Sequence, residues 1–243
     1  MILDIRDLSI QFQRKNSCSS IVEKVSFKVD LGEVVSIVGP SGCGKTTLLN
    51  AIAGLIDWSG DIQKEDGGDA SNIGYVFQQN RLLKWRTIAQ NIMLPIENIG
   101  ISKKELSSRV SNAMSLVGIE PLADCYPTEC STGEQVRAGI ARAIIRKPKI
   151  LLMDEPFSSL DELNARRLRK EVENFSIHKK TVILFVTHNV REAVFLSDRV
   201  IVLSELPAKI KGVVCIDTSR PRMQTGRILD GLEERVYDLL GVK

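Results

Sequence analysis

The segment Gly39-Pro-Ser-Gly-Cys-Gly-Lys-Thr-Thr47 has the residue types and spacing of a loop that binds phosphate groups. It matches GxxxxGK[ST] between a short apolar run and a helical pattern, which is the context this motif requires. Its glycines allow backbone N–H groups to turn inward and hold an anion at a helix start. Lys45 is expected to reach the β- and γ-phosphates of a nucleotide, and Thr46 to give its hydroxyl to Mg²⁺. The predicted contacts come from Gly39, Pro40, Ser41, Gly42, Cys43, Gly44, Lys45, Thr46 and Thr47.

A pair of carboxylates, Asp154 and Glu155, directly follows the apolar run 150–153. Ligands of parallel α/β sheets lie at the carboxyl ends of the strands, so both side chains are expected beside the phosphate loop. Asp154 suits a Mg²⁺ ligand that acts through water, and Glu155 a general base that polarises an attacking water. An ordinary strand end is the alternative, and the phosphate loop about 110 residues earlier argues against it.

His188 follows another apolar run, 182–186, at the same expected edge of the sheet. A single histidine is more often structural than catalytic. Its place after a buried strand favours contact with a γ-phosphate, whose loss an imidazole can sense.

The elements that must position these residues alternate between strands and helices. Apolar runs at 34–38, 150–153 and 182–186 predict buried strands of a mostly parallel sheet. Helical patterns at 45–55, 161–175 and 189–196 predict crossover helices, so the fold class is α/β. Segments 2–12 and 21–30 alternate as in an antiparallel sheet, whereas 103–117 and 133–146 are helical. We therefore expect one domain, 1–243, with an α/β core at 1–80 and 149–243 and a helical subdomain at 81–148.

Composition excludes several other classes of protein. A net charge of +3 over 243 residues is too small to indicate nucleic-acid binding. Five scattered cysteines form no CxxC pair and indicate reduced thiols, and two histidines are too few for a zinc cluster. The start MILDIRDLSI lacks the pattern of a signal peptide, and no apolar run approaches the roughly 18 residues needed to cross a bilayer. We expect a cytoplasmic protein.

Together these motifs resemble the ATPase subunit of ATP-binding cassette (ABC) transporters. The resemblance rests on GPSGCGKTT at 39–47, VFQQ at 76–79, LLMDEPFSSLD at 151–161 and His188, in the order of the family. RLLKWRTIAQNI at 81–92 and RPR at 220–222 are similar to the nitrate, sulfonate and taurine importer ATPases. Lys84 stands where those relatives usually have proline.

The resemblance implies a P-loop fold in which two copies bind two ATP molecules head to tail between them. It implies that Gln78 contacts Mg²⁺, that Phe12 stacks on adenine and that Asp161 belongs to the nucleotide site. It also implies ATP hydrolysis with Glu155, His188 and Lys45 as catalytic residues. Residues 80–95 would meet an integral membrane permease at the inner face of the membrane, although local packing explains their apolar character equally well. An extracytoplasmic solute-binding protein would complete an importer.

Two other functions remain open at this point. ABC ATPases of another class act on nucleic acid or ribosomes, but they usually carry coiled coils or two cassettes. A regulator that binds nucleotide without hydrolysis is the second, and Glu155 and His188 argue against it.

The family's signature segment, LSGGxxQRVxxARA, corresponds to CSTGEQVRAGIARA at 130–143. In the family, the counterparts of Ser131 and Gly133 face the partner's γ-phosphate at a helix N-terminus. Thr132 replaces a glycine. Its branched side chain predicts a brake on closure of the dimer, and its hydroxyl offers the alternative of an additional hydrogen bond.

Overall fold

A six-stranded sheet of order β5-β6-β7-β3-β8-β9 forms the centre of the computed structural model, which describes residues 2–14, 17–65, 72–179, 181–220, 222 and 227–241. Neighbouring strands are parallel except β8 and β9. Because β3, β6 and β7 pair in parallel, their carboxyl ends meet at one edge. All three are buried throughout, as predicted from their apolar runs. The strands are β3 (Val34–Val38), β5 (Ile73–Val76), β6 (Ile150–Asp154), β7 (Val182–Val186), β8 (Arg199–Leu203) and β9 (Ile210–Cys215).

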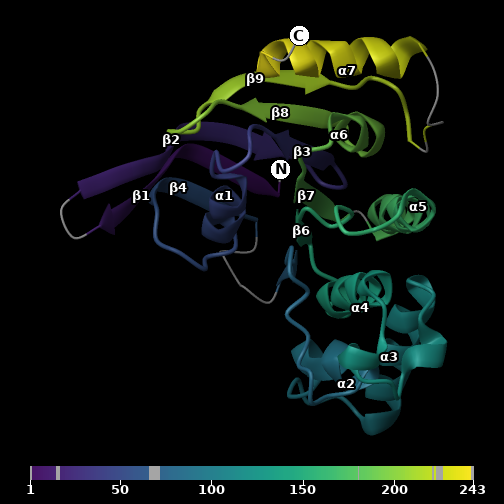
Figure 1. The fold of residues 1–243 in the computed structure, drawn as a ribbon. Coiled ribbons are helices and arrows are strands. Elements are labelled where there is room, and N and C mark those ends of the chain that lie inside the picture. Colours follow the sequence, from purple (N-terminus) through teal and green to yellow (C-terminus); the bar gives the residue numbers. More distant parts are fainter. Residues whose placement is uncertain are drawn as a thin grey trace.

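A second sheet is antiparallel and has the order β2-β1-β4. Its strands are β1 (Leu3–Arg14), β2 (Ser17–Val29) and β4 (Ser59–Lys64). Helix α1 (Lys45–Ile52) lies between the two sheets (Figure 1), and its Leu48, Leu49 and Ile52 are buried in one apolar cluster with residues of both. The alternation at 2–12 and 21–30 correctly predicted this sheet, whose inward residues form that cluster.

The remaining helices of the core cover the large sheet. Helix α5 (Glu162–Lys179) belongs to the apolar cluster on the face opposite α1. Helices α6 (Val190–Leu196) and α7 (Arg227–Leu240) form a third cluster with β8 and β9. In Figure 1, α7 lies across the outer edge of the molecule, next to β9.

Helices alone occupy the described chain between β5 and β6. They are α2 (Ile88–Met93), η2 (Leu94–Ile96), α3 (Lys103–Leu116), η3 (Glu120–Leu122), η4 (Pro127–Glu129) and α4 (Thr132–Ile144). Side chains cap the starts of the three α-helices, since Thr87, Ser102 and Ser131 each accept a hydrogen bond from the first turn. Figure 1 shows α2, α3 and α4 gathered at one end, away from the antiparallel sheet. They fall within 81–148, the range predicted for a helical subdomain.

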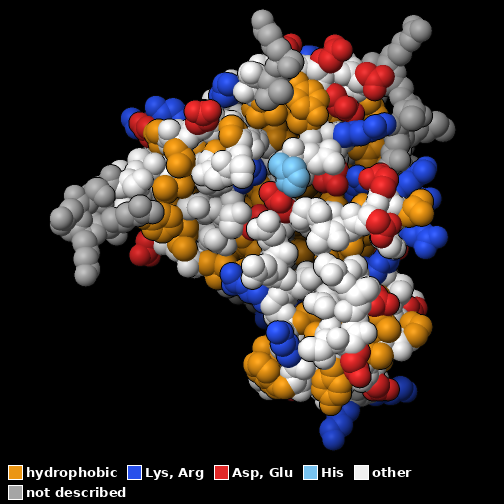
Figure 2. Space-filling view, viewed as in Figure 1, with side chains coloured by type: hydrophobic (Ala, Val, Ile, Leu, Met, Phe, Trp, Pro, Cys, Tyr) orange, Lys and Arg blue, Asp and Glu red, His pale blue; other side chains and the backbone are white. Residues whose placement is uncertain are grey.

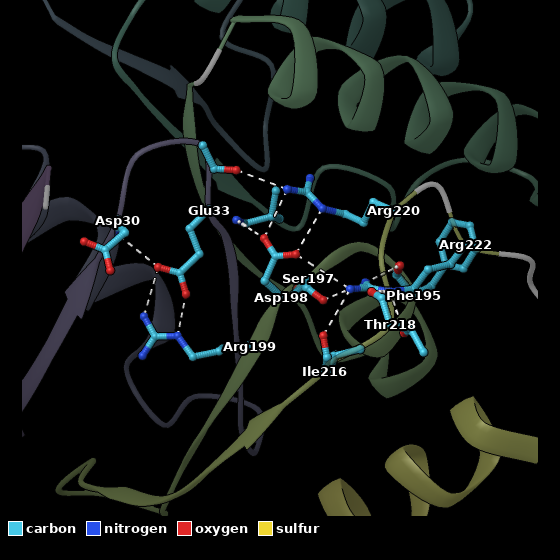
Figure 3. Close-up of polar contacts among 12 residues, drawn as sticks. Asp30, Glu33, Phe195, Ser197, Asp198, Arg199, Ile216, Thr218, Arg220 and Arg222 are labelled. Carbon is cyan, nitrogen blue, oxygen red and sulfur yellow. Dashed lines mark hydrogen bonds and ion pairs between the residues drawn. The ribbon is translucent and has the colours of Figure 1, made fainter.

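The two arginines of the RPR segment join the chain after β9 to the core (Figure 3). Arg220 Nε and Nη2 each donate to Asp198 at 3.1 Å. Arg222 Nη1 donates to the carbonyl oxygens of Phe195 at 3.0 Å and Ser197 at 2.7 Å. These contacts fix the loop between α6 and β8, so the two arginines have a structural role.

Candidate functional site

The phosphate loop connects β3 to α1 in a conformation that depends on glycine. Gly42 has φ 74° and Gly44 has φ 106°, a left-handed region that L side chains rarely adopt. Lys45 begins α1, and its ammonium donates to the carbonyl oxygens of Gly39 at 2.8 Å and Pro40 at 2.9 Å. The loop therefore holds its lysine inside the cradle, where phosphate oxygens can replace the two carbonyls.

Cys43 lies under this loop. Its side chain is 2% exposed and belongs to the apolar cluster between the sheets. A Cβ on Gly39 would stand 2.9 Å from Cys43 Sγ, so the glycine makes room for the thiol. Burial raises the pKa of the thiol, which keeps it protonated. The thiol therefore has a packing role, and any contact of Cys43 with a phosphate comes from its backbone.

Thr46 and Asp154, two of the predicted metal ligands, are in contact. Thr46 Oγ1 donates to Asp154 Oδ1 at 3.0 Å, and Asp154 is 3% exposed. Burial raises the pKa of Asp154, partly opposed by the Thr46 hydrogen bond. Among the described residues, no group of three or more Asp, Glu, His or Cys side chains is placed to hold a metal ion. One carboxylate and one hydroxyl fit Mg²⁺, which takes few protein ligands and completes its shell with phosphates and water.

Glu155 contacts two other predicted residues. Its Oε2 lies 3.1 Å from His188 Nδ1 and 3.5 Å from Gln78 Nε2. Glu155 has φ 46°, a strained conformation held by its N–H to the Val186 carbonyl at 3.0 Å and by the Ser158 hydroxyl. The strain aims the carboxylate toward the ends of β6 and β7. The His188 side chain is exposed, and Figure 2 shows a histidine beside acidic side chains on this face of the molecule.

The predicted signature residues are not part of this group. Ser131 caps α4, and its hydroxyl donates to Glu134 Oε2 at 2.8 Å. Thr132 is exposed, and a Cβ on Gly133 would approach Leu160 to 3.2 Å. Figure 1 shows α4 well separated from α1, which follows the phosphate loop. Ser131 is exposed, and the helix that it caps lies apart from the helix after its own chain's phosphate loop.

Two further predicted residues, Phe12 and Asp161, lie on other elements. Phe12 is 45% exposed on β1 and pairs with Ser19 of β2. Strand β2 passes close to the phosphate loop, because a Cβ on Gly44 would stand 2.8 Å from Ile21 Cγ2. Asp161 accepts from the Asn164 N–H at 3.0 Å and so caps α5.

Arg142 links two parts of the protein, and its contacts were not predicted from the sequence. Arg142 of α4 donates to the carbonyl oxygens of Asn80 at 2.6 Å and Arg81 at 2.9 Å. These residues follow Gln78, so the signature helix is tied to the segment that carries the amide. Its position within the signature segment was the one feature of the sequence that could have pointed to this role.

Comparisons with known proteins agree on one family. Residues 22–158 match the family described as ABC transporter. An uncharacterized ABC transporter ATP-binding protein of Methanocaldococcus jannaschii is 40% identical over 227 residues, covering 92% of this chain and 85% of that protein. The aliphatic sulfonates import ATP-binding protein SsuB of Bacillus thuringiensis is 33% identical over 240 residues, covering 97% and 94%.

Solved structures show the same fold. An ATP-binding cassette in a dimeric post-hydrolysis state with ADP and Pi has a TM-score of 0.82 at 24% identity, covering 90% of this chain and all of that one. A dimeric bacterial ABC transporter cassette has a TM-score of 0.81 at 25% identity, with the same coverage.

Proposed function

Because this chain belongs to the ABC transporter family and is an ATP-hydrolysing subunit, we propose that it energises import of a small anionic solute through a separate membrane permease. The observation that carries the catalytic part is the convergence of Gln78, Glu155 and His188 at the end of β6 and β7. The observation that favours import is the similarity to SsuB over nearly the whole of both chains.

The class of solute is proposed from that similarity. SsuB is named for aliphatic sulfonates, and the segment 81–92 is similar to importers of nitrate, sulfonates and taurine. All of these solutes carry an anionic group. The same similarity supports the proposed direction of transport, and an extracytoplasmic solute-binding protein is proposed as the further partner of such an importer.

The proposed hydrolysis uses an in-line water at the γ-phosphate. Glu155 accepts a proton from that water while the water oxygen forms a bond to the γ-phosphorus. At the same time the bond between the γ-phosphorus and the bridging β-phosphate oxygen breaks. His188 donates to a γ-phosphate oxygen, and Lys45 leaves its loop carbonyls to neutralise the phosphate chain. Mg²⁺ held near Thr46, Asp154 and Gln78 would neutralise the same oxygens.

A second copy of the chain is proposed to complete each ATP site. Ser131 and Gly133 lie in α4's first turn, away from the phosphate loop of their own chain, as Figure 1 shows for α1 and α4. A head-to-tail partner would bring them to the γ-phosphate. Support comes from the dimeric state of the two structurally similar cassettes.

The permease is proposed to dock on the helical part. Ala89, Gln90 and Met93 of α2 face Leu106 and Val110 of α3 across a mainly apolar cavity of about 310 Å³. Trp85, just before α2, is 74% exposed. In the described chain no helix is long and apolar enough to span a bilayer, so a separate permease would supply the pore. The chain would then sit at the inner face of the membrane.

Uptake by cells that carry or lack this gene tests the proposal. Deletion is expected to abolish uptake of radiolabelled taurine or an alkanesulfonate, and expression of the wild-type chain to restore it. Lys45→Ala is the matched variant, because it removes the ammonium that the phosphate loop holds, and it is expected not to restore uptake. Unchanged uptake after deletion, together with ATPase activity stimulated by nucleic acid, would contradict the import function.

A further inference from the structure

A chain of buried polar contacts begins directly behind His188. The preceding residue, Thr187, is 2% exposed, and its hydroxyl donates to Glu192 Oε2 at 3.0 Å. The same hydroxyl oxygen accepts from the N–H of the following residue, Asn189, at 3.0 Å. Both neighbours of His188 are therefore fixed by one hydroxyl. The direction of the exposed imidazole depends on the position of Thr187.

Glu192 in turn is held by Arg169. The N–H of Glu192 donates to the Asn189 side chain at 3.2 Å, within the first turn of α6. Its Oε1 accepts from Arg169 Nη1 at 3.3 Å, and both side chains are less than 10% exposed. Burial raises the pKa of Glu192, whereas the Thr187 hydrogen bond and the Arg169 charge favour its carboxylate form. Loss of Arg169 would leave this carboxylate buried without its cation, which is costly.

Arg169 also contacts the segment that follows the catalytic carboxylate. Its Nη2 donates to Glu162 Oε1 at 2.5 Å, and Glu162 is the first residue of α5, next to Asp161. Arg169 Nε is buried and has no hydrogen-bond partner among the residues that the structure describes. A cavity of about 230 Å³ lies beside the guanidinium and is lined in part by Glu162, Asn189 and Phe195. Because space remains there, the two carboxylates are the contacts that fix the guanidinium.

We propose that Arg169 is a positioning residue for ATP hydrolysis, which sets the His188 imidazole through Glu192 and Thr187 and links it to Glu162. Arg169 has no contact with the γ-phosphate or the attacking water. Its effect is on how often His188 points at the phosphate while Glu155 holds the water. The inference rests on ATP hydrolysis by this chain and is independent of the solute that is transported.

Steady-state kinetics of Arg169→Gln, His188→Ala and the double variant test the proposal. Arg169→Gln is expected to lower kcat about tenfold with KM for ATP within about twofold, because binding contacts are untouched. In the His188→Ala background, Arg169→Gln is expected to cause no further loss, because it acts through the imidazole. Arg166→Gln, an exposed arginine on the same helix, is the matched control and is expected to retain wild-type kcat.

Two outcomes would overturn the proposal: a wild-type kcat for Arg169→Gln, or losses that multiply in the double variant. Glu192→Gln is the second variant and carries the test if Arg169→Gln does not fold. It retains an acceptor for Thr187 but lacks the ion pair, and is expected to show the same non-additivity with His188→Ala. If these tests fail, the proposed import function still predicts that deletion of the gene abolishes solute uptake. The two proposals can therefore fail separately.

A spectroscopic readout separates positioning from general destabilisation. The chain has two histidines, so His178→Gln leaves one imidazole signal, that of His188. In that background Arg169→Gln is expected to shift or broaden the signal, and Arg166→Gln to leave it in place. An unchanged signal in a variant with reduced kcat would contradict the proposal.

Discussion

Thr46 Oγ1 and Asp154 Oδ1 are joined by a 3.0 Å hydrogen bond between the first turn of α1 and the last residue of β6. Two of the three residues expected at Mg²⁺ are thus held together by the fold itself. The hydrogen bond also lowers the pKa of Asp154 and so partly opposes the increase caused by burial.

Asp154→Asn is expected to stabilise the nucleotide-free protein at neutral pH while abolishing Mg²⁺-dependent hydrolysis. Burial raises the pKa of Asp154 above 3.8, so in the window between 3.8 and the raised value the native state binds more protons than the unfolded state. The free energy of unfolding of the wild type therefore falls as pH rises through that window. Urea unfolding across pH, with exposed Asp238→Asn as control, measures the difference. A neutral-pH destabilisation by Asp154→Asn would contradict this account.

Cys43 is expected to resist alkylation whether or not ATP is bound. Its thiol is buried and its pKa is raised, whereas Cys215 is exposed. Peptide mapping after iodoacetamide treatment should show Cys43 labelled at least about one hundredfold more slowly than Cys215. Fast labelling of Cys43 that ATP blocks would instead place the thiol in the phosphate cradle.

Thr132 is expected to act as a brake. It is exposed in the first turn of α4, on the surface proposed to meet the second copy. Thr132→Ala and Thr132→Gly should raise kcat about two- to threefold, and Thr132→Val, which retains the branch, should keep the wild-type rate. Thr132→Gly should also lower the free energy of unfolding by about 1 kcal/mol relative to Thr132→Ala. A loss of activity in Thr132→Val would indicate that the hydroxyl is the functional group.

Trp85→Ala is expected to separate membrane attachment from hydrolysis. Its side chain is 74% exposed beside the helical part and far from Glu155 in sequence. The free protein should retain wild-type ATPase activity, and its retention on membranes from its own cells should fall about tenfold or more. Trp58→Ala, at a 40% exposed tryptophan before β4, serves as the control. Equal retention of both variants would exclude Trp85 from the docking surface.

The sequence predicted those strands and helices whose pattern of apolar and polar residues reflects which of their faces are buried. The runs 34–38 and 182–186 coincide with β3 and β7, because strands buried on both faces are continuously apolar. The pattern at 45–55 is three residues longer than α1, which ends before Gly54 takes φ 76°. Strand β4 carries the polar sequence SGDIQK and was not predicted, since its pairing with β1 is set by tertiary contact.

The site was predictable where a motif fixes both residue type and strand end. Asp154, Glu155 and His188 were assigned to one sheet edge, and the structure brings Glu155 and His188 to 3.1 Å. The direction of the Cys43 thiol was not predictable, because it depends on space that Gly39 leaves. The contact of Arg169 with Glu192 joins residues 23 positions apart through tertiary packing, which no local pattern encodes.

We propose that Glu155 activates the water that attacks ATP. The steady-state ATPase rate of Glu155→Gln, measured at saturating ATP with bound nucleotide quantified, tests it most directly. Glutamine retains the shape and a hydrogen-bond acceptor but cannot take a proton, so the rate should fall about 10²- to 10³-fold. ATP binding should be preserved, and a nucleotide-bound dimer should accumulate. Turnover at the wild-type rate would contradict the claim.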